Sequence, residues 1–596
     1  MRLGVRCSSG GTKPPCAVRG QRRAGPPSER APMKKAAGAG EVTGIGISLW
    51  VPFVSGFVAE SSSDDAHESK ARIRTTSLTR IDKPSGSARS SVMSFARSLG
   101  LLVLLLASSV QAAPRFATVF SDHMVIQRDR GIKVWGFGAR TGDKLYVRFA
   151  ITTVPCKIES TGRWSARLPA AKASSTGRRL ELLNGDEVVD AAGDVLVGEV
   201  WLAAGQSNMG FTVNAMKRGL PDAEDWISTA EYPAIRMRRV NDPVLMNRKA
   251  GAIDLMVGSW VPISPESVGR MSAVASVCAR VMHERLNVPI GVIDVSWGGK
   301  PIEPFIPREA FSSPLMRKIV ELSDSDQLED LRKLRGGVFV RNPQGRPGAI
   351  FNARMAPITE FGVRGFLWYQ AESNCGRSED PRDYRFKMTA LADGWRGRWR
   401  QADLPLYYVQ LPSFPTATGW IRMREEQRLA QSIPHSGMVV TIDVPGEGIH
   451  PPDKISVGRR LARLALGKTY GMDVTNSVGP RYAGHRVVGG EVRVSFTNAN
   501  GLMVGHKPGV LSARETSGAL DWFELADGQG NWHDATARIE GMEVIVSSPL
   551  VTNPMAVRYA CDVEPQGFNL YNAAGLPASP FCSDLGLLAW EDHGAK

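Results

Sequence analysis

Ser207 is a candidate nucleophile because of its place in the chain. It belongs to the segment GQSNM, residues 205–209, which directly follows an apolar run over 197–204 that predicts a strand. A serine on a turn from strand to helix exposes its hydroxyl at the sheet edge, and its backbone N–H lies at a helix start, which suits an oxyanion. Met209 replaces the second glycine of G-x-S-x-G, so the usual hydrolase elbow does not apply. The alternative is a serine that only caps the helix.

His450 could supply the base that this serine needs, because a neutral hydroxyl is a poor nucleophile. It lies in the polar loop EGIHP, residues 447–451, rather than on an apolar face. An acid three residues before the histidine folds back to the imidazole within one turn and fixes its tautomer. Glu447 stands at that position, and Asp443, at the end of a predicted strand, is the alternative acid.

Two further polar segments also follow predicted strands. In SWGGK, residues 296–300, Gly298 and Gly299 let a backbone N–H approach a ligand closely. In WYQAESN, residues 368–374, Gln370 can point its side-chain amide into the same site. Each signal alone is weak, since most Gly-Gly pairs are turns and many loop amides bond their own backbone.

The elements that would position these residues lie between 196 and 470. Strands are predicted at 197–204, 288–295, 365–369, 405–411 and 438–442, and helices at 271–286, 383–399, 424–432 and 455–466. This alternation predicts an α/β fold with a parallel sheet and right-handed crossovers. All four polar segments then lie at the carboxyl ends of parallel strands, where an active site belongs. The flanking regions, 113–195 and 471–596, show short alternating strands, which predict a β-sandwich-like domain on each side.

The basic character of the chain is concentrated at its start. Of the formal net charge of +14, residues 1–92 carry +8 and residues 93–112 carry +1, which leaves +5 for the other 484 residues. A basic excess suggests nucleic acid, but its distribution removes that support, and no nucleic-acid partner is expected. Residues 1–92 are rich in Gly, Ser, Pro and Arg and lack periodicity, so we expect them to be disordered.

Residues 93–112 have the layout of a secretory signal peptide. Arg97 provides a positive charge, 99–107 is an apolar run, and Val110 and Ala112 are small residues at the −3 and −1 positions of a cleavage site. Such a signal works only at an N-terminus, so we expect translation to start at Met93 and 1–92 to be a gene-model extension. The protein is then periplasmic or secreted, with no integral membrane segment after cleavage.

The cysteines give no sign of a metal site. None has metal-ligand spacing, and neither a metal nor an organic cofactor is expected. In an exported protein Cys561 and Cys582 could pair, whereas Cys278 belongs to an apolar helical pattern and is expected in the core. The five cysteines after residue 112 are Cys156, Cys278, Cys375, Cys561 and Cys582.

Taken together, the motifs resemble those of the sialate O-acetylesterases and related carbohydrate acetylesterases of the SGNH hydrolase superfamily. GQSNM and WYQAESN carry most of the specificity, and the likeness covers nearly all of the chain after residue 112. Other matching segments are 124–127 (MVIQ), 297–299 (WGG), 301–303 (PIE), 449–454 (IHPPDK), 569–572 (NLYN) and 575–577 (GLP). The resemblance implies a flavodoxin-like parallel-sheet catalytic domain over 196–470.

The resemblance also implies roles for the candidate residues. Ser207 would be the nucleophile and His450 the general base, with Glu447 as the acid. The N–H of Ser207, an N–H of Gly298 or Gly299, and the Gln370 amide would form the oxyanion hole. The chain departs from the family pattern at Ala371, where glycine is usual, and at Glu447, where aspartate is frequent. Glu372 would only orient its loop.

The expected activity is therefore removal of O-acetyl groups from a carbohydrate by an exported serine esterase, with acetylated sialic acid as the expected substrate. One alternative is an esterase for acetylated xylan or another polysaccharide, because the same catalytic set serves both. The other is a non-catalytic carbohydrate-binding protein, which the joint presence of Ser207, Gln370 and His450 disfavours. The motifs leave the oligomeric state open.

Overall fold

The computed structural model describes residues 113–240, 257–325, 327, 345–375, 380–416, 419–444, 446, 448–472 and 477–588. These residues belong to one compact unit, Gly100–Lys596. The predicted extension 1–92 and signal peptide 93–112 lie outside the described residues, so both stay predictions. Across the part of the chain that is described, no helix has the length and apolar character needed to cross a membrane.

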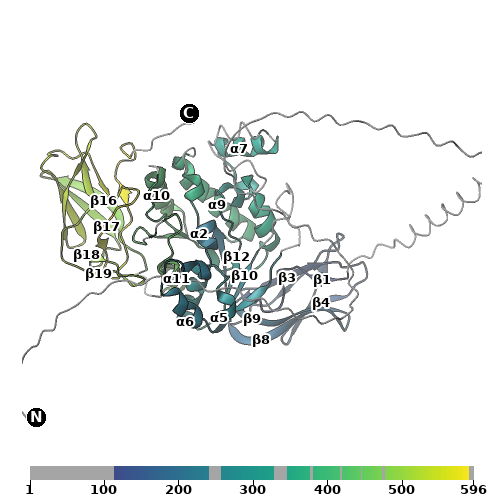
Figure 1. The fold of residues 1–596 in the computed structure, drawn as a ribbon. Helices are drawn as coiled ribbons and strands as arrows, with labels where there is room; N and C mark the ends of the chain where they lie inside the picture. Colours follow the sequence, from purple (N-terminus) through teal and green to yellow (C-terminus); the bar gives the residue numbers. More distant parts are fainter. Residues whose placement is uncertain are drawn as a thin grey trace, which may run out of the picture. The chain divides into compact units, whose positions relative to one another are not determined.

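A parallel sheet runs through the α/β region (Figure 1). Its strand order is β10-β12-β9-β13-β14-β15 with all neighbours parallel, and β11 joins its edge antiparallel to β10. The strands are β9 (Glu187–Gly205), β10 (Tyr232–Arg239), β11 (Trp260–Ile263), β12 (Ile290–Asp294), β13 (Gly365–Tyr369), β14 (Leu406–Val409) and β15 (Ser436–Val439). The prediction of an α/β fold is confirmed.

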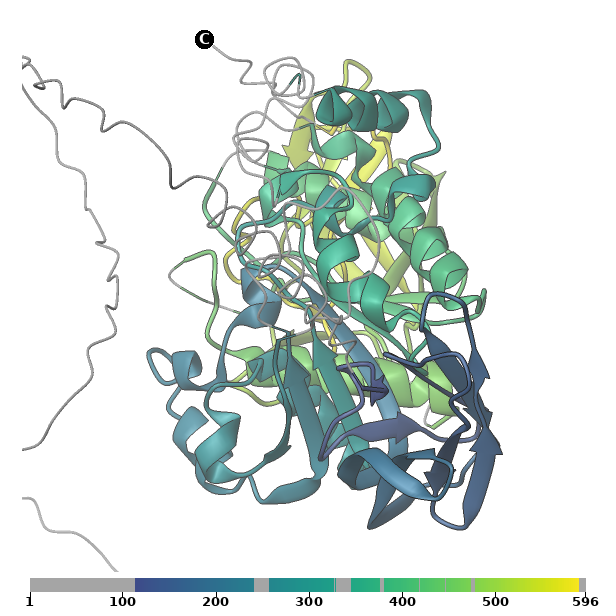
Figure 2. The same ribbon diagram turned by 90° about the vertical axis from the view of Figure 1, so that its right-hand side faces the viewer.

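Alternate side chains of each strand pack on opposite faces of the sheet, because the side-chain period of a strand is two. On β9, Leu202 joins the apolar cluster that contains residues of helix α9, whereas Trp201 joins the cluster that contains residues of α6 and α11. Helices therefore cover both faces, as a parallel sheet requires (Figures 1 and 2). The α-helices are α2 (Ser207–Gly210), α3 (Val213–Met216), α4 (Ala223–Ser228), α5 (Pro265–Val268), α6 (Ala273–Leu286), α7 (Pro314–Asp324), α9 (Tyr384–Trp399), α10 (Gly419–Leu429) and α11 (Lys454–Tyr470).

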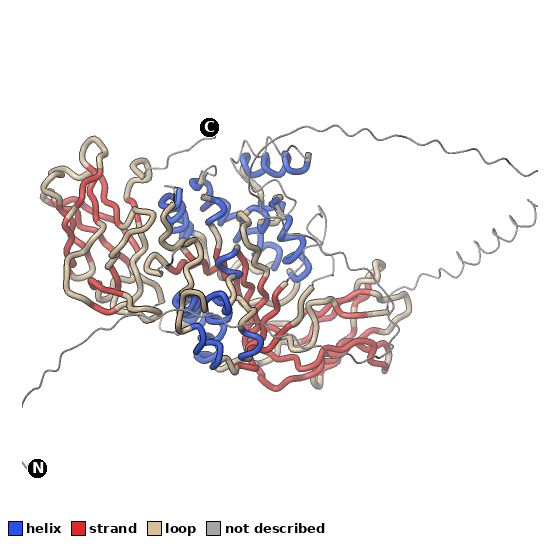
Figure 3. The backbone as a smooth tube through the Cα atoms, in the orientation of Figure 1, coloured by secondary structure: helices blue, strands red, loops and turns tan. Residues whose placement is uncertain are grey.

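The described residues before and after this region form strands and loops (Figure 3). The earlier strands are β1 (Arg115–Phe116), β2 (Val125–Gln127), β3 (Ile132–Phe137), β4 (Leu145–Phe149), β5 (Thr152–Pro155), β6 (Lys157–Ile158), β7 (Trp164–Leu168) and β8 (Ser174–Asn184). The later ones are β16 (Arg481–Val488), β17 (Glu491–Thr497), β18 (Met503–His506), β19 (Arg514–Glu515), β20 (Phe523–Ala526), β21 (Trp532–Asp534), β22 (Thr536–Glu540), β23 (Glu543–Ser547), β24 (Ala556–Tyr559), β25 (Leu570–Tyr571) and β26 (Phe581–Cys582). Strand β9 pairs with β8 before it enters the parallel sheet, so the expected boundary at 195–196 falls inside one continuous strand.

The cysteines differ in part from expectation. Cys278 is fully buried on α6, as its apolar pattern predicts. Cys561 and Cys582 are free thiols rather than a disulfide. Each thiol donates to a backbone carbonyl instead, Cys561 to Phe581 and Cys582 to Asp584, at 3.2 and 3.1 Å.

Candidate active site

Ser207 lies at the carboxyl end of β9, where the strand turns into the short helix α2. The turn depends on Gly205, which has φ +134°, and a Cβ there would stand 2.1 Å from the carbonyl oxygen of Tyr369 on β13. Glycine therefore lets β9 and β13 pair up to their last residues, Gly205 opposite Tyr369. The predicted strand-to-helix turn at the nucleophile is present in the structure.

His450 faces this serine from a loop between β15 and α11. Its Nε2 lies 2.7 Å from Ser207 Oγ, a hydrogen bond across 243 residues of sequence. Desolvation of the imidazole, and then the positive charge of Lys454, lower the pKa of His450 below its ordinary value. Both effects favour the neutral ring, which is the form that can accept the serine proton.

The two candidate acids have different outcomes. The side chain of Asp443 is buried and forms a two-bond ion pair with Arg460 on α11, at 2.6 and 2.7 Å. Among the described residues, no carboxylate forms an ion pair with His450. Glu447 lies outside the described residues, so its role as the acid stays a prediction.

The two glycines after β12 occupy different positions. The N–H of Trp297 donates to the carbonyl of Gly205 at 2.8 Å, which brings the segment beside the nucleophile turn. A Cβ built on Gly298 would lie 3.6 Å from Ser207 Cβ, whereas one on Gly299 would meet nothing within 4 Å. Gly299 instead has φ +65° and makes the turn. Gly298 is thus the glycine that lies against the nucleophile.

Gln370 is fully buried after β13, and its amide is held by other protein groups. Its Nε2 donates to Gln206 Oε1 at 3.1 Å and to Asn374 Oδ1 at 2.9 Å, and the carbonyl oxygen of Lys300 lies 3.3 Å away. Its Oε1 accepts a hydrogen bond from the Tyr384 hydroxyl at 2.8 Å. The amide would have to release one of these acceptors in order to donate to an oxyanion.

Sequence reasoning missed a buried polar group directly beneath the Ser–His pair. The Nδ2 of Asn208 donates to Glu372 Oε1 at 2.5 Å and to the carbonyl oxygen of Ile449 at 2.9 Å, and its Oδ1 accepts from Lys454 Nζ at 2.5 Å. Glu372 thus contacts the residue next to the nucleophile as well as its own loop, through Ala371 N. One feature of the sequence could have indicated this group: Asn208 lies in the same motif as Ser207, and Lys454 lies in the same motif as His450.

A cavity of about 970 Å³ opens beside His450. Residues near Ser207 line it together with residues that follow strand β18 and precede strand β25, so the later β region contributes to this site. Arg218 lines the cavity with an exposed guanidinium that forms no hydrogen bond or ion pair to any described residue. Other charged or ionisable lining residues are Asp443, His506, Lys507, Glu564 and Tyr571.

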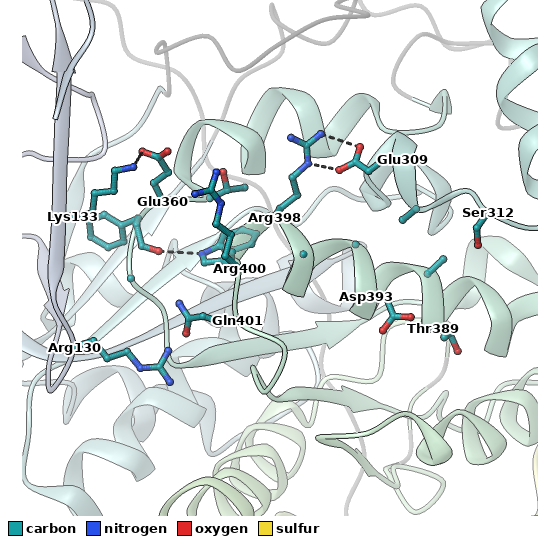
Figure 4. Close-up of a pocket in the computed structure, with 18 of the residues that line it drawn as sticks. Arg130, Lys133, Glu309, Ser312, Glu360, Thr389, Asp393, Arg398, Arg400 and Gln401 are labelled. Atoms are coloured by element: carbon teal, nitrogen blue, oxygen red, sulfur yellow. Dashed lines mark hydrogen bonds and ion pairs between the residues drawn. The ribbon is translucent and has the colours of Figure 1, made fainter. Parts of the chain in front are cut away.

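A second cavity, of about 1240 Å³, lies elsewhere and contains neither Ser207 nor His450 (Figure 4). Its lining includes Phe361, just before β13, and Gln401, just before β14. It therefore borders the amino ends of these parallel strands, opposite the edge where Ser207 lies. Figure 4 shows ion pairs on its wall, Lys133 with Glu360 and Arg398 with Glu309. This position argues against a role in the chemistry at Ser207.

Comparison with known proteins adds independent findings. The family model described as "Carbohydrate esterase, sialic acid-specific acetylesterase" matches residues 348–467. The sialate O-acetylesterase of Rattus norvegicus is 25% identical over 551 residues, 82% of this chain and 98% of the relative. That of Homo sapiens is 27% identical over 425 residues, 64% of this chain and 76% of the relative. A crystal structure of a carbohydrate acetylesterase from Xanthomonas citri matches with a TM-score of 0.69 and 28% identity, covering 79% of this chain and 100% of that one. These matches confirm the resemblance that the motifs indicated.

Proposed function

We propose that this sialate O-acetylesterase-like carboxylic ester hydrolase is an exported enzyme that removes O-acetyl groups from acetylated sialic acid. The observation that carries the chemistry is the 2.7 Å contact between Ser207 Oγ and His450 Nε2 at the carboxyl edge of the parallel sheet. A serine hydroxyl and a neutral imidazole in this geometry form an activated nucleophile.

The proposed reaction has two halves. In the first, Ser207 Oγ attacks the acetyl carbonyl carbon while His450 takes the hydroxyl proton. The tetrahedral intermediate collapses, the bond between the carbonyl carbon and the sugar oxygen breaks, and His450 returns the proton to the leaving sugar hydroxyl. In the second, water attacks the acetyl-serine, its proton passes to His450, and acetate leaves as Ser207 regains the proton.

We assign the oxyanion hole to the backbone N–H groups of Ser207 and Gly298, with Gln370 as the side-chain donor. The closeness of Gly298 to Ser207 supports the choice of Gly298 over Gly299. Each well-placed donor is worth roughly 3 kcal/mol in the barrier. Glu447 is our proposed acid, because Asp443 is bound to Arg460 and Glu447 has the triad spacing from His450.

Arg218 supports sialic acid over a neutral polysaccharide as the substrate. A sialic acid carries a carboxylate, whereas xylan has none on its main chain, and a guanidinium is the side chain best suited to bind a carboxylate with two hydrogen bonds. Arg218 lines the His450 cavity, and a Cβ on the next residue, Gly219, would lie 2.9 Å from Pro452 Cγ in the histidine loop. The Arg218 segment therefore lies beside the histidine loop.

The test measures acetate release from an aryl acetate, acetylated sialic acid and acetylated xylan. We expect wild type to hydrolyse acetylated sialic acid. In Arg218→Gln, kcat/KM for that substrate should fall roughly 10- to 100-fold, which corresponds to the loss of one hydrogen bond to a charged group. Hydrolysis of the aryl acetate should not change. Arg178→Gln is the matched control, since Arg178 is an exposed arginine on β8 outside the cavity. Greater activity on xylan that is insensitive to Arg218→Gln would support the polysaccharide alternative.

A further inference from the structure

Lys454 is a buried cation for which the two-step reaction has no direct use. It is the first residue of α11 and has no exposed surface. Its ammonium lies 5.0 Å from the ring centroid of Phe211 and 5.5 Å from that of Tyr369. Burial of an ammonium is costly unless its donors are bonded. The hydrogen bond to Asn208 Oδ1 reduces this cost, but the presence of a buried charge at this position needs a reason.

Asn208 is held in one orientation by the groups around it. An ammonium only donates hydrogen bonds and an ionised carboxylate only accepts them. The amide oxygen of Asn208 must therefore face Lys454, and its NH₂ group must face Glu372. The remaining N–H of that group then points to the carbonyl oxygen of Ile449, at 2.9 Å.

This one side chain joins the two halves of the catalytic pair. Asn208 directly follows Ser207, and Ile449 directly precedes His450. The amide thus fastens the base loop to the nucleophile turn, one residue from each reacting group. Across the described residues, the Ser207–His450 contact itself and the bond from Lys454 to Asn208 also connect these two segments.

We propose that Lys454 is a positioning residue of the esterase site, because through Asn208 it holds the His450 loop over Ser207. This inference rests on the proposed function of the Ser207–His450 pair. Lys454 touches no reacting atom, and it acts through Asn208 and through space.

The electrostatic part has a defined pH range. Burial lowers the pKa of Lys454 to about 7 and raises that of Glu372. Below pH 7 the ammonium is charged, which covers the range in which an imidazole normally titrates. Its charge then opposes protonation of His450. The other charged or ionisable groups that line the cavity beside His450 are Arg218, Asp443, His506, Lys507, Glu564 and Tyr571.

The test compares Lys454→Met and Lys454→Gln with wild type on an aryl acetate over pH 5–8. In Lys454→Met, kcat should fall about 10-fold or more with KM changed less than threefold, since small displacements of a reacting group are costly. The acid limb of kcat/KM should move upward by about half a pH unit or more, because a repelling charge is gone. Lys454→Gln keeps an N–H donor but no charge, so it should show the same pH shift with a smaller loss of kcat.

The matched control is Lys468→Met on the same helix. Lys468 donates to the carbonyl oxygen of Ser436 at 2.9 Å, and it lies 14 residues beyond Lys454, roughly 21 Å along the axis. It should leave kcat and the acid limb unchanged. Wild-type kcat in folded Lys454→Met would overturn the positioning role, and an acid limb at the wild-type pH in either folded variant would overturn the electrostatic role. Absence of esterase activity in wild type would instead overturn the proposed function itself.

Discussion

Asp443 gives both of its carboxylate oxygens to Arg460, at 2.6 and 2.7 Å, and so is committed to helix α11 rather than to His450. Asp443→Asn should therefore reduce stability more than chemistry, because it leaves a buried guanidinium without its counter-ion. We expect a loss of about 3 kcal/mol or more in the free energy of unfolding, measured by denaturant titration. A loss of kcat in the folded variant as large as that of Glu447→Gln would contradict this assignment.

Glu447→Gln should have the opposite effect. Without the carboxylate, the imidazole is no longer held in the tautomer that accepts the Ser207 proton, and kcat should fall by on the order of 10³- to 10⁴-fold. Stopped assays on an aryl acetate, together with thermal unfolding of the same samples, separate this loss from misfolding. Near-wild-type kcat would remove Glu447 from the proposed triad.

The two glycines after β12 should respond differently to alanine. Gly298→Ala places a methyl group against Ser207, where the acetyl group must lie, and should lower kcat/KM by about 10-fold or more. Gly299→Ala forces a left-handed backbone on a residue with a side chain, and should cost roughly 1 kcal/mol of stability with less effect on kcat/KM. A larger loss of kcat/KM in Gly299→Ala than in Gly298→Ala would assign the oxyanion donor to Gly299 instead of Gly298.

The pH dependence of the reaction follows from the direction of the His450 shift. Only the neutral imidazole can take the serine proton, so kcat/KM is lost as pH falls through the His450 pKa. Because burial and Lys454 lower that pKa, the midpoint of the acid limb in Glu447→Gln, which lacks the proposed carboxylate partner, should lie below the ordinary imidazole value of 6.5. A midpoint above 6.5 would contradict the described electrostatics.

The N-terminus of the natural protein tests the expected export. If translation starts at Met93 and the signal is cleaved after Ala112, Edman sequencing of the protein from its native host should begin at Ala113. The enzyme should also be recovered from the periplasm or the medium. A mature end within residues 1–92 would refute both the start site and the signal peptide.

The contact between Ser207 and His450 could be predicted from the sequence because each residue follows a recognisable local pattern. The apolar runs before Ser207 and before the His450 loop predicted parallel strands, and parallel strands bring their carboxyl ends together. The apolar pattern over 271–286 likewise predicted the helix that the structure has as α6, Ala273–Leu286. These features depend on neighbours in sequence, and the structure contains them.

The buried support of the site left no such local pattern. Asn208 meets Glu372 from 164 residues away and Lys454 from 246 residues away, so only the folded chain brings them together. A lysine at the start of an apolar helix indicates a solvated end by pattern alone, yet Lys454 is buried. The sequence also did not predict that residues 187–195 belong to the same strand as residues 197–204. Their place in β9 depends on pairing with β8 and not on their own composition.

The most direct test of the central claim is trapping of the acetyl-enzyme. Wild type mixed rapidly with an aryl acetate and quenched in acid should carry an acetyl group on the peptide that contains Ser207, identified by tandem mass spectrometry. Ser207→Ala should show no acetylation and lose most acetate release, and His450→Ala should acquire the group far more slowly. Full acetate release by Ser207→Ala, or an acetyl group on another residue at catalytic rates, would show that Ser207 is not the nucleophile.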